Sequence, residues 1–127
     1  PINTDIYEEY IPEEVGSVKI ADEVISIVAG LAATEVTGVA GMSGGLAGGI
    51  AELLGKKNFS KGVKVIVAGK TVTIEIYVII EYGVSIPEVA IAIQEKVKEA
   101  VESMTAFEVA AVDIHVQGIA RRDLKGN

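Results

Sequence analysis

The chain contains no cysteine and no tryptophan, and its only aromatic residues are four tyrosines and two phenylalanines among 127 residues. Without cysteine, it can form neither a disulfide framework nor a reactive thiolate, which is typical of a cytoplasmic protein. Half of the residues are hydrophobic, so the core must be built from valine, isoleucine, leucine and alanine. A chain of this length forms one domain that buries roughly two thirds of its unfolded surface.

Long apolar runs are also missing. No stretch reaches the ~20 apolar residues that a membrane-spanning helix needs. The N-terminal residues are acidic and polar, whereas a signal peptide has a basic region followed by an apolar one. We therefore expect a cytoplasmic protein that does not insert into the membrane directly.

Negative charge dominates, with a formal net charge of −7. Residues 1–15 carry a net charge of −5 and residues 121–127 a net charge of +2, which leaves −4 for the body. An acidic body disfavours non-specific binding to nucleic acid or anionic lipid. We predict an acidic disordered tail over residues 1–15, a single domain over residues 16–119 and a basic C-terminal tail over residues 120–127.

The first predicted helix runs from Asp22, as its N-cap, to about Glu35, and a short strand could precede it at residues 18–20. Its polar positions form a narrow strip of mostly small residues, so nearly all of its circumference is apolar. Such a helix is buried on more than one side. In a domain this small, we expect the second side to pack against another subunit.

The remaining periodicity predicts a β-hairpin, a second helix and a last strand. The hairpin strands span residues 62–68 and 71–82. Ser85 and Glu88 form a capping box with Pro87 in the first turn of a helix that ends near Thr105, and residues 109–119 alternate as a strand. The fold class is α+β with two layers: two main helices packed on one face of a small three- to four-stranded sheet, with the β-hairpin in the middle.

Seven of the fourteen glycines lie between Gly38 and Gly55. A phosphate-binding P-loop needs two glycines separated by four residues and followed by Lys and then Ser or Thr, but five residues separate Gly49 from Gly55 and Lys57 follows Lys56. No two glycines are two residues apart, so the dinucleotide fingerprint is missing as well. A nucleotide cofactor is not expected.

A KH-like RNA clamp is an alternative interpretation of the same stretch. It requires Gly-x-x-Gly between two helices, which Gly41 to Gly44 would supply. The tetrapeptide is common in proteins, and the acidic body opposes RNA binding. The acid-free run of lysines that could contact phosphates is more simply a solvated loop and sheet edge: Lys56, Lys57, Lys61, Lys64 and Lys70.

Catalytic and metal sites have little support in the sequence. His115 is the only histidine, so a zinc site would depend on carboxylates, which is an unusual ligand set. Asp113 and His115 share a strand face and could form a general-base pair, but a solvated sheet surface is the strongly favoured interpretation. We predict no catalytic, cofactor-binding or metal-binding residues.

Packing is the remaining interpretation of the glycine-rich stretch. Gly41, Gly45 and Gly49 recur every four residues, as small residues do along a helix face that makes close contacts. The alternative is a flexible loop that leads into one short helix, because several glycines disfavour an isolated helix. The candidate interaction segment comprises Met42, Leu46, Ile50, Leu53, Leu54, Lys56 and Lys57.

An ordered set of short motifs resembles the alkaline-shock-protein family, also called the Gram-positive envelope stress response family. The resemblance covers residues 16–119 and includes Gly38-Val-Ala-Gly-Met42, Lys61-Gly-Val63, Tyr82-Gly-Val-Ser-Ile-Pro-Glu-Val-Ala90, Ile93-Gln94, Met104-Thr105 and Val112-Asp-Ile-His-Val-Gln-Gly-Ile119. It implies a cytoplasmic α+β protein without known catalytic activity that self-associates and is linked to cell-envelope or alkaline stress.

The same resemblance implies the partners. Some members associate with the inner face of the membrane through an anchored partner protein, and others are linked to fatty-acid synthesis. We therefore expect a homo-oligomeric scaffold protein that acts by protein–protein interaction, with regulation of fatty-acid synthesis and KH-like RNA binding as alternatives. The family supplies no catalytic residues to transfer to this chain.

Overall fold

The computed structural model describes residues 15–44 and 60–121. The predicted acidic tail, apart from Val15, and most of the predicted basic tail lie outside these residues. The elements are α2 (Asp22–Thr34), β1 (Val39–Met42), β2 (Val63–Ala68), β3 (Thr71–Glu81), α4 (Ile86–Thr105) and β4 (Glu108–Ala120). None of the described helices is long and apolar enough to cross a bilayer.

The central strand of the four-stranded sheet is β3. On one edge it pairs antiparallel with β2 along its first half and with β1 near its end. On the other edge it pairs with β4 in parallel. The parallel pair follows from α4, which crosses over between the two strands. The predicted α+β class, the hairpin and the last strand are confirmed, and β1 is a strand that the sequence analysis did not predict.

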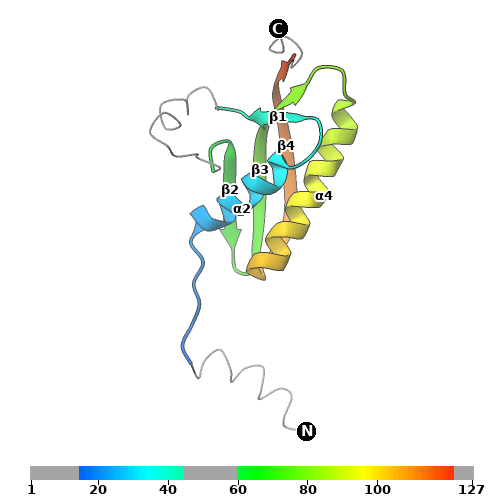
Figure 1. Ribbon diagram of the computed structural model, residues 1–127. Coiled ribbons are helices and arrows are strands. Elements are labelled where there is room, and N and C mark those ends of the chain that lie inside the picture. The colour runs from blue at the N-terminus through cyan, green and yellow to red at the C-terminus, as the bar shows by residue number, and fades with distance from the viewer. Residues whose placement is uncertain (1–14, 45–59, 122–127) are drawn as a thin grey trace.

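Both helices cover the same face of the sheet (Figure 1). The alternating residues of β3 that point to this face are all buried, as are the inner residues of both helices. The fully buried large side chains are Ile25, Ile74, Ile76, Ile80, Ile93, Val72, Val78, Val97 and Val101. The core is therefore aliphatic, as the lack of aromatic residues predicted, and neither of the two described helices covers the opposite face of the sheet.

The first helix starts differently from its prediction. Asp22 lies inside α2, and the N-cap is Ala21, which makes no side-chain capping bond. For α4 the capping prediction is confirmed, because the Ser85 hydroxyl accepts a hydrogen bond from the Glu88 amide at 3.4 Å and Pro87 lies in the first turn. The predicted strand at residues 18–20 is wrong, since this segment pairs with no described strand.

One residue of β3 anchors both ends of the connection between β1 and β2. The Tyr77 carbonyl accepts a hydrogen bond from the Ser43 amide at 2.8 Å, and the Tyr77 amide donates to the Gly62 carbonyl at 2.8 Å. Gly62 has a φ of +82°, and a Cβ there would lie 3.0 Å from the carbonyl oxygens of both Ser43 and Tyr77. Glycine is therefore required where the chain re-enters the sheet.

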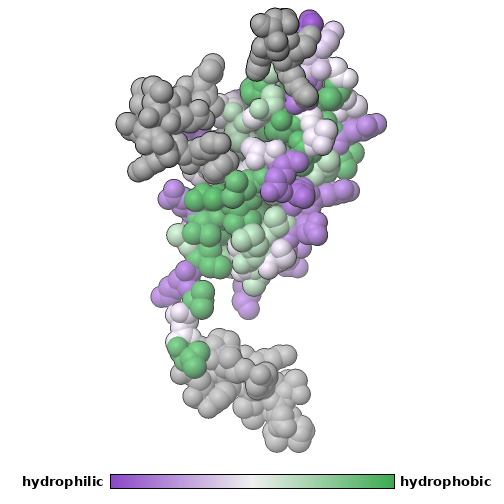
Figure 2. Space-filling model, viewed as in Figure 1, coloured by the Kyte–Doolittle hydropathy of each residue, from purple (hydrophilic) through white to green (hydrophobic). Residues whose placement is uncertain are grey.

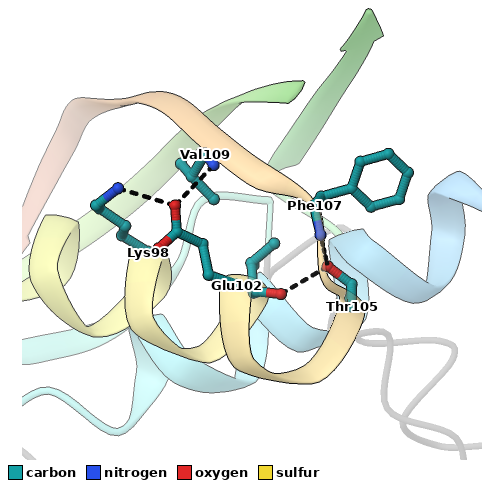
Figure 3. A network of polar contacts seen from close by, with 6 residues as sticks. Lys98, Glu102, Thr105, Phe107 and Val109 are labelled. Carbon is teal, nitrogen blue, oxygen red and sulfur yellow. Dashed lines mark hydrogen bonds and ion pairs between the residues drawn. The ribbon is translucent and has the colours of Figure 1, made fainter. Parts of the chain in front are cut away.

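Side-chain hydrogen bonds hold the turn from α4 to β4 (Figure 3). One Glu102 oxygen accepts from the Val109 amide and from Lys98 Nζ, each at 2.9 Å. The Thr105 hydroxyl donates to the Val101 carbonyl at 2.6 Å and accepts from the Phe107 amide at 3.2 Å. These bonds fix where β4 begins beside β3.

This network makes the stability dependent on pH. The Val109 amide and, to a smaller extent, Lys98 hold the pKa of Glu102 below its ordinary value, against a weaker opposing effect of desolvation. A lowered pKa in the folded state stabilises the protein above the unfolded pKa of about 4.3, and this stabilisation is lost as the pH falls through the folded pKa. Glu102→Gln should therefore lower the urea midpoint at pH 7, and its difference from wild type should shrink below about pH 4.

The control for this prediction is Glu99→Gln, an exposed change on the same helix. It should leave the midpoint close to wild type at every pH. A constant difference between Glu102→Gln and wild type from pH 7 to pH 3 would contradict the role of the Glu102 charge.

Candidate interaction surface

The predicted interaction segment is only partly within the described residues. Met42 lies at the end of β1, where it is partly buried and packs against the core. The other six candidates lie outside the described residues: Leu46, Ile50, Leu53, Leu54, Lys56 and Lys57. The interaction role of this segment therefore stays a prediction.

The two helical interpretations of the glycine-rich stretch are wrong at its start. Gly41 lies in β1 opposite Ile79, so it cannot begin a helical face of small residues. Gly44 follows in a turn with a φ of +91°. A KH clamp needs its Gly-x-x-Gly between two helices, whereas here the tetrapeptide starts inside a strand. Because β1 pairs with β3, Gly41 is in a strand, and neither the small-residue helix face nor the KH clamp can begin there.

Polar side chains gather on the sheet face that carries no helix. Tyr77 donates its hydroxyl to Glu75 Oε1 at 2.6 Å and stacks on His115 with ring centroids 4.4 Å apart. His115 Nε2 lies 3.7 Å from Glu75 Oε1. The hydrogen bond to Glu75 raises the pKa of Tyr77, with smaller contributions from desolvation and the Glu75 charge, so this phenol stays protonated at neutral pH.

The predicted alternative of an Asp113–His115 general-base pair finds no support in this geometry. His115 contacts Tyr77 and Glu75, and no hydrogen bond joins it to Asp113 among the described residues. No group of three or more His, Cys, Asp or Glu side chains in residues 15–44 and 60–121 could hold a metal ion. The cluster is best described as cross-strand packing on a solvated sheet face.

A pocket of about 510 Å³ opens beside β1. It is lined by Ala40, Gly41, Met42, Ser43, Gly44, Ile79 and Ala120. Among its described lining residues there is no titratable side chain and one hydroxyl, Ser43 Oγ, which donates to Gln117 Oε1 at 2.7 Å. The pocket therefore offers apolar contact and no acid or base.

The outer surface of α2 carries apolar side chains that are exposed to solvent. Its inner residues are buried, but Val24 is 46% exposed, Leu31 is 39% exposed and Ile27 between them is partly exposed. These residues follow a spacing of three and four, so they form one stripe along the helix. Figure 2 shows an apolar patch at the position of α2 and the neighbouring part of β2. We call Val24, Ile27 and Leu31 the outer stripe.

A second feature is the segment before α2, where the sequence analysis predicted a short strand at residues 18–20 but no interaction role. Residues 15–20 run away from the domain without helix or strand pairing (Figure 1). Val15 is 86% exposed and Val18 is 90% exposed, whereas Ile20 packs against the core. In the sequence, the apolar residues at positions 15, 18 and 20 are the pattern that could have indicated an exposed contact segment, although Gly16 and Ser17 interrupt this pattern.

The described part of the lysine run surrounds β2. Lys61 precedes this strand, Lys64 lies within it and Lys70 follows it. None of the ion pairs found in the described part of the chain includes these three lysines. The interpretation as a solvated loop and edge fits their positions.

This chain is similar to a family model and to two proteins of Bacillus subtilis. The family model for alkaline shock protein 23, described as having a cell envelope-related function, matches residues 10–121. An uncharacterised Bacillus subtilis protein, YqhY, is 46% identical over 104 residues, which cover 82% of this chain and 77% of the relative. Another uncharacterised Bacillus subtilis protein, YloU, is 42% identical over 106 residues, which cover 82% of this chain and 88% of the relative.

More distant matches include a stress response regulator and a solved structure. The gls24 homologue of Streptococcus pyogenes, named a stress response regulator, is 29% identical over 109 residues, covering 85% of this chain and 61% of the relative. A solved MamM-CTD chain aligns with a TM-score of 0.49 and 14% identity, over 77% of this chain and 99% of that chain. On the family model and on relatives at 42–46% identity, the chain belongs to the alkaline shock protein 23 family, whose function is related to the cell envelope.

Proposed function

We propose that this protein acts without catalysis, by self-association and by binding other proteins in the response to envelope or alkaline stress. The observation that carries the proposal is the exposed outer stripe of α2. A helix with one apolar side in the core and a second apolar side in water gains free energy when another surface covers it, at about 25 cal/mol per Å² of apolar area buried. Exposed apolar patches of this kind mark contact sites between proteins.

The chemistry of the described residues supports a binding role over a catalytic one. The pocket beside β1 lacks a titratable side chain, and the open sheet face holds His115 between an aromatic ring and a carboxylate. Membership of an envelope-related family and the relation to a stress response regulator suggest the setting. In this proposal the protein works in the cytoplasm, at the inner face of the membrane, through a membrane-anchored partner.

The test is the mass of the full chain as a function of concentration. Wild type should sediment as species heavier than a monomer, in a concentration-dependent manner. Leu31→Glu places a charge in the outer stripe and should weaken the association constant at least tenfold. Ile91→Glu is the matched control, because Ile91 is an exposed isoleucine on α4, and it should leave the association unchanged.

Two outcomes would overturn the proposal. A wild-type chain that stays monomeric at the highest soluble concentration removes self-association. Equal effects of Leu31→Glu and Ile91→Glu, with both variants folded by circular dichroism, remove the outer stripe as the surface that matters.

A further inference from the structure

We propose that residues 15–20 of one copy add as an extra strand to the free edge of β2 in a second copy. The inference rests on the self-association proposed above and names the surfaces that make the contact. It is carried by three observations: an apolar segment that pairs with no described strand, an edge of β2 that no described strand covers, and acidic residues preceding the segment that complement a basic edge.

The segment forms no helix and pairs with no described strand, and Gly16, with a φ of +111°, is the residue whose backbone would have to change for it to join a sheet. It leaves α2 through Ala21, whose φ and ψ of −69° and 149° are extended. Val15 and Val18 are almost fully exposed, although valine is a residue that sheets favour and water disfavours. Covering the exposed side chains of Val15 and Val18 in a contact with another surface lowers the free energy.

The receiving edge is the outer side of β2. Gly62 bonds Tyr77 across the ladder, and β2 pairs with β3 in antiparallel register from Val63 opposite Ile76 to Ala68 opposite Thr71. Backbone groups alternate along an antiparallel strand, so Val65 and Val67 direct their N–H and C=O groups away from β3. An edge of this kind is a template for another strand unless proline, a bulge or a covering element blocks it.

Lysine is a further device that discourages strand addition, and Lys64 lies within β2; proline, a bulge and a covering element are not found among the described residues around this strand. The strand has no proline and pairs with β3 without a bulge. Its exposed side chains include Ile66, at 51%, and Val67. Along the opposite edge of the sheet, by contrast, the Gln94 side chain donates to the Val112 carbonyl of β4 at 3.0 Å and Glu102 accepts from the Val109 amide. Side chains of α4 therefore occupy part of the β4 edge, which leaves β2 as the better acceptor.

Charge favours the same pairing. The residues joined to the segment are strongly acidic, because residues 1–15 carry a net charge of −5. The β2 edge is basic, since Lys61, Lys64 and Lys70 lie before, within and after the strand. The segment itself carries one charge, that of Lys19, so the attraction comes from the acidic residues that precede Val15. Strand addition also places the second copy next to the outer stripe of α2, which packs over β2.

The chain lacks cysteine, so single-cysteine variants allow a direct test. Val18→Cys and Ile66→Cys proteins are mixed and treated with a short bismaleimide. The mixture should give a crosslinked heterodimer, and Val18→Cys mixed with Ile91→Cys is the control that should not. A chain carrying both Val18→Cys and Ile66→Cys should crosslink into dimers or larger species.

Proline variants test the backbone pairing separately. Val18→Pro and Lys19→Pro each remove one N–H from the segment, and neighbouring N–H groups of a strand point in opposite directions. At least one of the two should weaken the association constant tenfold or more. Both should leave the unfolding temperature of the diluted monomer unchanged, because the segment stands away from the domain.

The outcomes separate this inference from the proposed function. If wild type associates, Leu31→Glu weakens it and neither proline variant does, strand addition is overturned and self-association through the outer stripe stands. Crosslinking of the double-cysteine chain only within one copy also overturns strand addition between copies. A strictly monomeric wild type overturns both.

Discussion

Gly62→Ala should destabilise the protein by about 3 kcal/mol or more. A non-glycine residue in the left-handed region costs about 1–2 kcal/mol, and Gly62 has a φ of +82°. The new Cβ would also lie 3.0 Å from two backbone oxygens, those of Ser43 and Tyr77, and the hydrogen bond from the Ser43 amide to the Tyr77 carbonyl holds these two residues together. The measurement is the free energy of unfolding in urea.

The matched control is Gly69→Ala. Gly69 also has a positive φ, of +65°, but a Cβ there meets no atom within 4 Å. This change should cost only the conformational term, about 1 kcal/mol. If the two variants unfold at the same urea concentration, crowding at the re-entry point of the chain is not what requires Gly62.

Ile76→Ala should destabilise the protein by about 4 kcal/mol. Ile76 is fully buried in the middle of β3, where the central strand faces both helices. Truncating a buried isoleucine to alanine loses its transfer free energy and leaves a cavity, which together cost about 2–5 kcal/mol. Ile76 is surrounded by other core side chains, which cannot easily move to fill the cavity, so we expect a value in the upper part of this range.

Ile66→Ala is the corresponding change on the neighbouring strand. Ile66 is 51% exposed on the open face of the sheet, so its truncation should cost about 1 kcal/mol or less. Differential scanning calorimetry on both variants checks the contrast. Equal losses would mean that the open face of the sheet is covered in solution.

The elements with a clear periodicity were predictable from sequence. The alternation along residues 71–82 and the Ser85–Glu88 capping box each depend on neighbouring residues, and the structure places β3 and α4 as expected. The sequence analysis made no prediction of which strands pair; a helix between two strands allows a parallel pair, but the register of β3 with β4 depends on how α4 packs across the sheet. That information is not local.

The glycine-rich stretch shows the limit of spacing arguments. Gly41 and Gly44 have small-residue spacing that suits a helix or a clamp, yet Gly41 pairs in β1 because Met42 and Val39 can pack against the core on either side of it. Four residues are too short for a strand pattern to stand out. For the interaction surface, the sequence predicted the apolar circumference of α2. It did not show that residues 15–20 extend away from the domain, because this depends on the folded structure.

The two backbone hydrogen bonds of Tyr77 determine where the chain should tolerate insertions and deletions. Because Ser43 and Gly62 are fixed to the same residue, the chain between them begins and ends at one place on the sheet. Lengthening a flexible connection between two fixed points costs only about 0.6 kcal/mol for each doubling of its length. Insertions and deletions at this point should therefore leave the sheet intact, which makes it the place where a reporter peptide or a new binding sequence can be added to the fold.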